Sequence, residues 1–182
     1  ALTGNPLFDA IGTLFIGVLL IAVAAILAVE MKSLLIGEGA TSEDHARVQR
    51  VLNANPGVEA VILSDAIEGE ARDVGQVHAA LVREIGSRDR PFRKPVLLLS
   101  GGETTVTLTG GDRGRGGRNT TFLLSFALGI TGMSNVWAMA ADTDGIDGSE
   151  ANAGAFADGS SIARMLSAGI DARRTLLKND AW

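Results

Sequence analysis

The sequence contains no cysteine and only two histidines, His45 and His78, among its 182 residues. The absence of cysteine excludes disulfide-stabilised scaffolds, thiolate metal sites and cysteine nucleophiles. Two histidines are too few for a histidine-rich zinc site. The sequence also lacks a basic stripe, and its net charge is −5, so we expect no nucleic-acid partner.

The composition allows one ordinary domain, or a smaller domain with an appendage. The hydrophobic fraction of 46% is enough to build a core. Glycine is abundant, with 23 residues, and most of them follow residue 100. This asymmetry indicates two unlike halves.

A long apolar run occupies residues 10–29, which contain no charged side chain. Twenty helical residues span roughly 30 Å, the thickness of the bilayer hydrocarbon core. Asp9 precedes the run, and Glu30 and Lys32 follow it, whereas a signal peptide begins with basic residues. The pattern predicts one transmembrane-like helix. A fully buried helix in a soluble core is the alternative.

The residues around this run, 4–10 and 30–38, resemble the last transmembrane helix and cytoplasmic exit of cation diffusion facilitator transporters. The similarity continues to about residue 62, with a helix expected from Ser42 to Asn53 and a strand from Val58 to Ile62. The resemblance implies a membrane anchor through residues 10–29 and a cytoplasmic location for the rest. The resemblance does not include a transport site, because residues 10–29 contain no ionisable side chain that could bind a metal ion. A cation efflux transporter fragment is therefore the alternative function.

The rest of the chain has the pattern of an α/β domain. Its apolar spacing predicts alternating strands and helices, which implies a mainly parallel sheet flanked by helices on both faces. A loop is expected at residues 65–70 and another at 110–117. We predict strands at 58–63, 95–99, 104–109 and 136–141, and helices at 71–85, 119–128, 159–167 and 171–178.

Two polar clusters follow predicted strands, where ligands bind in such folds. Ser100, Gly101, Gly102 and Glu103 follow one strand. The two glycines permit unusual backbone angles and close approach to a ligand. Asp142 and Asp144 lie in the second cluster, at residues 142–145, after another strand.

A third cluster, at residues 110–119, is rich in glycine and arginine. Arg118 stands at the entrance of a predicted helix, where backbone N–H groups and a guanidinium suit a phosphate or carboxylate. For Arg113 and Arg115, a solvated hairpin tip explains the sequence equally well. The glycine pattern matches neither a Walker loop nor a dinucleotide fingerprint.

The acidic loop after residue 141 does not fit a calcium-binding EF-hand. Counted from Asp142, positions five, six and twelve would be Ile146, Asp147 and Ala153, where the motif requires an oxygen ligand, glycine and glutamate. A solvated turn explains Asp147 and Glu150. Asp142 and Asp144 abut a buried strand, however, and a carboxylate there needs a partner such as Mg²⁺ or a polyhydroxy substrate.

Three ordered stretches, 97–107, 114–124 and 140–155, resemble the C-terminal (MOFRL) domain of type II glycerate kinases, older relatives of which were called hydroxypyruvate reductases. The similarity runs from about residue 63 to 182. It implies ATP-dependent phosphorylation of D-glycerate to 2-phosphoglycerate in a cleft between two domains, with ATP and Mg²⁺ as cofactors. The implied catalytic residues are Asp142, Asp144 and Glu103; the implied substrate- or phosphate-binding residues are Ser100, Gly101, Gly102, Arg118 and Asn119; and the implied Mg²⁺ ligands are Asp142 and Asp144.

The two resemblances divide the chain into three parts. Residues 1–40 are expected to form the transmembrane-like helix and its exit, 41–62 a short helix–strand segment, and 63–182 the glycerate-kinase-like domain, incomplete at both ends. The join lies near residues 58–64. Because the nucleotide-binding half of the family is missing, we expect this chain alone to have little or no kinase activity. If the first part is an artefact, the location is simply cytoplasmic.

Overall fold

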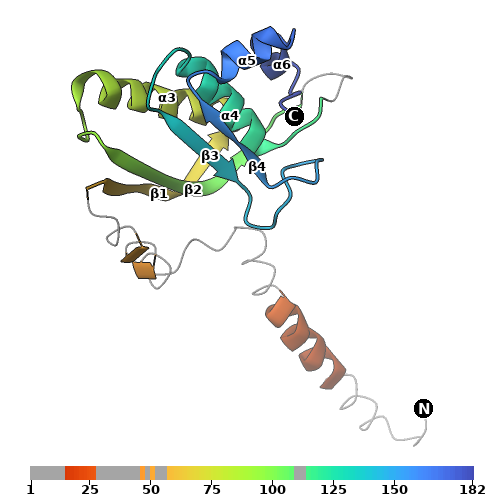
Figure 1. Ribbon diagram of the computed structural model, residues 1–182. Coiled ribbons are helices and arrows are strands. Elements are labelled where there is room, and N and C mark those ends of the chain that lie inside the picture. Colours follow the sequence, from red (N-terminus) through yellow and green to blue (C-terminus); the bar gives the residue numbers. More distant parts are fainter. Residues whose placement is uncertain (1–14, 28–45, 48–49, 52–56, 109–113) are drawn as a thin grey trace, which may run out of the picture. The chain divides into compact units, whose positions relative to one another are not determined.

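The computed structural model describes residues 15–27, 46–47, 50–51, 57–108 and 114–182 (Figure 1). The chain divides into two compact units, Ala1–Asp44 and His45–Trp182, and we describe each by itself. Every predicted site residue belongs to the second unit.

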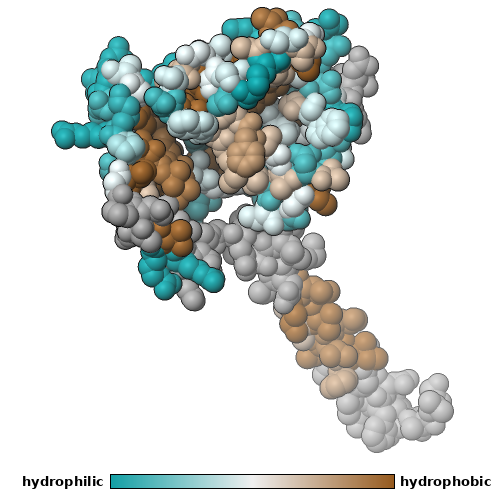
Figure 2. Space-filling model, in the orientation of Figure 1, coloured by the Kyte–Doolittle hydropathy of each residue, from teal (hydrophilic) through white to brown (hydrophobic). Residues whose placement is uncertain are grey.

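In the first unit, residues 15–27 form a helix whose visible face is apolar (Figure 2). Its large side chains are exposed, including Phe15 at 69% and Ile21 at 72%. At 1.5 Å per residue, the described residues of this helix span about 20 Å. Across the described ranges, no helix is both long and apolar enough to cross a membrane.

The predicted membrane-anchored location is therefore wrong. Only 15–27 of the expected span is described as helix, and residues 10–14 and 28–29 lie outside the described ranges. The expected helix from Ser42 to Asn53 also falls mostly outside them, although residues 46–47 and 50–51 are helical.

The second unit begins its regular structure with a parallel strand pair, β1 (Glu59–Glu70) and β2 (Val96–Thr105). β1 was expected to end near residue 63. It continues through the predicted loop 65–70 because those residues pair with the second half of β2, after register shifts between Ile62 and Ile67. The predicted boundary between residues 62 and 63 thus falls inside one strand.

β2 also merges two expected strands into one. Residues 100–103, expected as a polar cluster after the end of a strand, lie inside β2 and pair with residues 64–68 of β1. The strand continues only to Thr105, because residues 106–108 have no regular structure and residue 109 is outside the described part.

Two helices, α3 (Ala71–Arg88) and α4 (Arg118–Gly129), pack against each other, close to their predicted positions. Ala79 of α3 meets Phe126 and Ile130 at the end of α4, and all three side chains are at most 4% exposed. Seven of the twelve residues of α4 are buried. α4 is therefore the central helix of the unit, and its first residue is the predicted site residue Arg118.

β3 (Trp137–Ala141) and β4 (Gly154–Asp158) form an antiparallel pair that also packs against α4. β3 was predicted and β4 was not. The inward alanines of this pair pack against Leu123 and Ala127 of α4. The unit is thus an α/β fold containing a parallel strand pair and helices, but the described strands form two separate sheets (Figure 1).

Two short helices, α5 (Ser161–Ser167) and α6 (Ala172–Leu177), complete the unit and match two predicted helices. Asp158 precedes α5 and accepts hydrogen bonds from Ser160, Ser161 and Arg164. The bonds from the Ser160 hydroxyl and from Arg164 lower the pKa of Asp158 to about 2. This carboxylate therefore stabilises the fold mainly in its charged form.

We predict that Asp158→Asn lowers the urea midpoint at pH 7 and that its effect disappears near pH 2. The folded-state pKa is depressed, so the stabilisation is fully present above about 3.9, the usual pKa of an unfolded aspartate. It is lost as pH falls through about 2. Urea unfolding of both proteins between pH 2 and 7 measures the difference. An effect of equal size at both ends of that range would contradict the assigned cause.

Candidate active site

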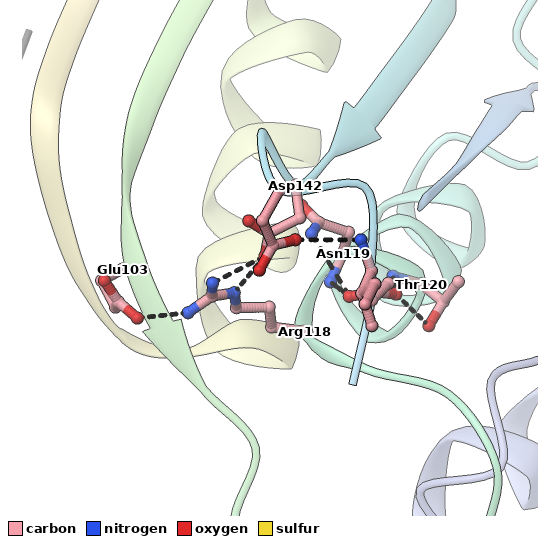
Figure 3. A network of polar contacts seen from close by, with 8 residues as sticks. Glu103, Arg118, Asn119, Thr120 and Asp142 are labelled. Carbon is pink, nitrogen blue, oxygen red and sulfur yellow. Dashed lines mark hydrogen bonds and ion pairs between the residues drawn. The ribbon is translucent and has the colours of Figure 1, made fainter. Parts of the chain in front are cut away.

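Arg118 lies between two acidic side chains from different elements (Figure 3). Its Nε and Nη2 donate to one carboxylate oxygen of Asp142, at 2.9 and 2.6 Å, and Asp142 follows β3. Its Nη1 donates to Glu103 of β2 at 2.5 Å. Because Arg118 is the first residue of α4, this cluster joins the parallel strand pair, the central helix and the antiparallel pair.

The two ion pairs of Arg118 differ in exposure. The Asp142 side chain is 13% exposed, the Arg118 side chain 32% and the Glu103 side chain 59%. Asp142 first, and then Glu103, raise the pKa of Arg118 above its usual value, so the guanidinium stays charged. The pair with Asp142 is shielded from water, whereas Glu103 is the more exchangeable partner.

Asp147 is the residue of this region whose burial differs most from the prediction. It was expected in a solvated turn, but it is fully buried. Its carboxylate accepts bonds from the backbone N–H groups of Asn119 and Thr120, at 2.9 and 2.8 Å. It also accepts from the Thr120 hydroxyl at 2.8 Å and from the Asn119 amide at 3.2 Å.

The carboxylate of Asp147 therefore occupies the anion-binding position at the start of α4. The positive end of the helix dipole and the unpaired N–H groups of the first turn attract such a charge. We had expected these backbone groups, around residues 116–119, to bind a ligand anion. In the structure, the N–H groups of Asn119 and Thr120 bind an internal carboxylate.

A glycine is required where the acidic loop meets the start of α4. A Cβ on Gly117 would lie 2.4 Å from the Asp147 carboxylate and 2.5 Å from the backbone nitrogen of Gly148. The Gly117 N–H donates to the Thr120 hydroxyl at 3.0 Å. The glycines of this predicted ligand loop thus permit close contact between two segments of the protein.

The other predicted binding residues lie inside β2. Gly102 has φ 142°, and a Cβ there would lie 2.2 Å from backbone atoms of Ile67. The close packing of β2 against β1 therefore explains why residue 102 is a glycine. Side chains three residues apart normally face opposite sides of a strand. In the structure, Ser100 contacts His78 of α3 and Glu103 contacts Arg118 of α4.

The remaining acidic and arginine residues lie outside the Arg118 cluster. Asp144 is exposed and accepts from the Ile146 N–H at 2.9 Å, as in a turn. Arg115 donates to both oxygens of Glu150, at 3.0 and 2.6 Å, and stacks 3.7 Å from the Trp182 ring. Arg115 is therefore a structural residue rather than a hairpin-tip charge, and Arg113 is outside the described part.

No group of three or more metal-ligating side chains occurs among the described residues. One oxygen of Asp142 already accepts two bonds from Arg118, which neutralises its charge. Asp144 is exposed and keeps more room for an ion. The residues thus suit at most an ion held by one or two carboxylates and completed by ligand oxygens, the usual arrangement of Mg²⁺ with a phosphate substrate.

The fold is similar to part of a solved glycerate kinase. The crystal structure of glycerate kinase from Thermotoga maritima matches with a TM-score of 0.70 and 34% sequence identity, over 78% of this chain and 34% of that one. Residues 96–182 match the sequence model of the MOFRL family. This part of the chain is therefore a MOFRL domain of the kind found in glycerate kinases.

Curated relatives agree with this assignment. A putative hydroxypyruvate reductase of Agrobacterium vitis is 50% identical over 126 residues, which are 69% of this chain and 33% of the relative. The glycerate 2-kinase of Pyrococcus horikoshii is 39% identical over 126 residues, 69% of this chain and 28% of the relative. The chain thus spans about a third of the relatives that it matches. These matches give no support to the transporter resemblance of residues 1–62.

Proposed function

We propose that the second unit forms one wall of a glycerate kinase active site. In a complete protein, that site would phosphorylate D-glycerate with ATP to give 2-phosphoglycerate. The observation that carries the proposal is the Arg118 cluster, which brings Glu103 and Asp142 together from two sheets at the start of the central helix. The relatives named as glycerate kinases support the choice of substrate.

In this proposal, Arg118 binds the carboxylate of glycerate. A guanidinium has five N–H donors in a planar fork that matches a carboxylate. Three donor contacts join Arg118 to Asp142 and Glu103. Because the Glu103 side chain is 59% exposed, a ligand carboxylate can take its place while Asp142 keeps the guanidinium oriented.

The acidic residues take the remaining tasks. Phosphoryl transfer depends on positioning and charge neutralisation more than on covalent chemistry by the protein. Once released from Arg118, Glu103 would orient the attacking hydroxyl. Asp144, exposed and outside the Arg118 cluster, is the better candidate to hold Mg²⁺ together with nucleotide phosphates. Bound Mg²⁺ would neutralise phosphate charge at that position.

The proposal is tested by titrating D-glycerate, ATP and Mg²⁺ separately into the purified chain in a calorimeter. We expect glycerate to bind, since Arg118 and Glu103 belong to the described unit. ATP should bind weakly or not at all, because the second wall belongs to the part of the relatives that this chain does not span. Absence of glycerate binding would overturn the assignment of this wall.

We also predict little or no glycerate-dependent ATP consumption by this chain alone. A site with one wall leaves the reacting groups in contact with water and unable to hold both substrates in reactive geometry. A coupled assay for ADP release, with and without D-glycerate, measures the rate. Substantial turnover would show that the chain contains a complete site. The transporter alternative has no supporting observation among the described residues, so we propose no second function.

A further inference from the structure

His78 of α3 forms a hydrogen-bonded pair with the predicted binding residue Ser100. The distance between His78 Nε2 and Ser100 Oγ is 3.0 Å. The other ring nitrogen, Nδ1, lies 2.9 Å from the carbonyl oxygen of Val74 in the preceding turn of α3. In the sequence, His78 carries no signal of a role in the site, since two histidines are too few for a histidine-rich zinc site.

The partners of the two ring nitrogens determine which of them carries the proton. A carbonyl oxygen only accepts, so His78 Nδ1 must be the donor to Val74. In the neutral ring, Nε2 is then an acceptor. The Ser100 hydroxyl therefore donates its single proton to His78. Both lone pairs of Ser100 Oγ remain able to accept hydrogen bonds.

The ring of His78 is also fixed by packing. It meets the ring of Phe122 edge to face, with centroids 5.1 Å apart and an interplanar angle of 77°. Phe122 lies one helical turn after Arg118 in α4, so the two side chains share a face of that helix. The His78–Ser100 pair thus borders the side of α4 on which Arg118 holds its acidic partners.

A Ser100 hydroxyl whose proton is already hydrogen-bonded to His78 can only accept a hydrogen bond from a ligand. An anionic oxygen of a carboxylate or phosphate offers only lone pairs and is repelled there. A ligand hydroxyl, by contrast, donates a proton to Ser100. The hydrogen-bond direction therefore makes this position selective for a hydroxyl over an anionic oxygen.

We infer that His78 is a positioning residue that makes Ser100 an obligate acceptor for the C3 hydroxyl of bound D-glycerate. This inference rests on the proposed function, in which Arg118 binds the carboxylate. The C3 hydroxyl is the one farther from that carboxylate, and Ser100 precedes Glu103 along β2. The pair then recognises the end of the substrate opposite to the end that Arg118 binds.

The first test is independent of glycerate binding. Because His45 and His78 are the only histidines, a His45→Gln variant of the full chain leaves one imidazole. Its ¹⁵N spectrum at pH 8 should show a protonated Nδ1 and an unprotonated Nε2. A protonated Nε2 would overturn the inference, because Ser100 would then be free to donate to an anion.

The second test is calorimetric titration of D-glycerate into full-length variants. His78→Phe keeps the ring against Phe122 and removes both nitrogens, and Ser100→Ala removes the acceptor. Each should weaken binding about tenfold, the effect of one hydrogen bond. The double variant should bind no more weakly than Ser100→Ala. His78→Gln, whose amide oxygen can accept from Ser100, should restore most of the affinity.

Two controls separate the possible outcomes. D-lactate lacks the C3 hydroxyl, so its affinity should be the same for wild type and Ser100→Ala. Val77→Ala, at a neighbouring position that is 68% exposed, should leave glycerate binding unchanged. Failure of the wild-type chain to bind glycerate overturns the proposed function. Normal glycerate binding by both His78→Phe and Ser100→Ala overturns this inference alone.

Discussion

Replacing Asp147 with alanine should destabilise the second unit by at least about 3 kcal/mol. The fully buried carboxylate accepts four hydrogen bonds from the first turn of α4. Its removal leaves two backbone N–H groups and a hydroxyl buried without this partner, and each unpaired group costs about 1–3 kcal/mol. Since domains are stable by only about 5–15 kcal/mol, a large fraction of the chains should be unfolded in mild urea.

The matched comparison is Asp147→Asn against Asp144→Asn. Both make the same chemical change in the same loop, but Asp144 is exposed and accepts a hydrogen bond from the Ile146 N–H. Asp147→Asn should lower the urea midpoint clearly, because an amide group then faces an N–H donor, whereas Asp144→Asn should change it little. Far-ultraviolet circular dichroism follows the unfolding. Equal midpoints for the two variants would mean that Asp147 does not anchor α4.

Replacing Arg118 with alanine should reduce turnover by about 10²-fold or more when the same change is made in a complete glycerate kinase. This is the usual effect of removing one electrostatic group from a transition-state site. In the present chain, the same change should abolish measurable glycerate binding. Arg118→Lys keeps the charge but not the fork that meets Asp142 through two nitrogens, so it should recover only a small part of the activity.

Arg115→Ala is the control for this experiment. Arg115 lies three positions before Arg118, but it binds Glu150 and stacks on Trp182 instead of joining the Arg118 cluster. Its loss should lower stability modestly and leave the affinity for glycerate unchanged. If Arg115→Ala and Arg118→Ala weaken glycerate binding equally, the effect is general positive charge, and Arg118 has no specific role.

Local patterns predicted most elements of the second unit because each helix has its own apolar spacing. α3 and α4 begin within one residue of their predicted starts. The merging of residues 96–105 into one strand could not be predicted, because it depends on pairing with the distant residues 59–70. β4 was missed for the same reason, since its residues 154–158 become a strand only beside β3.

The candidate site shows the same division between local and distant information. Sequence position identified Arg118, Glu103 and Asp142, which do come together. It misjudged Asp147, because an Asp-Gly pair is typical of an exposed turn. Only the fold places this aspartate at the start of α4. His78 had no local signal either, since its partner Ser100 is 22 residues away.

Asp147 joins the loop that carries Asp142 to the first turn of α4, which begins with Arg118. The distance between the Asp142 carboxylate and the Arg118 guanidinium is therefore set by folding, before any ligand binds. In water, solvent dipoles must reorient around a charge that develops during a reaction, and this raises the barrier. Groups fixed by a folded scaffold do not need to reorient. The site is thus preorganised, with a low reorganisation energy for the proposed phosphoryl transfer.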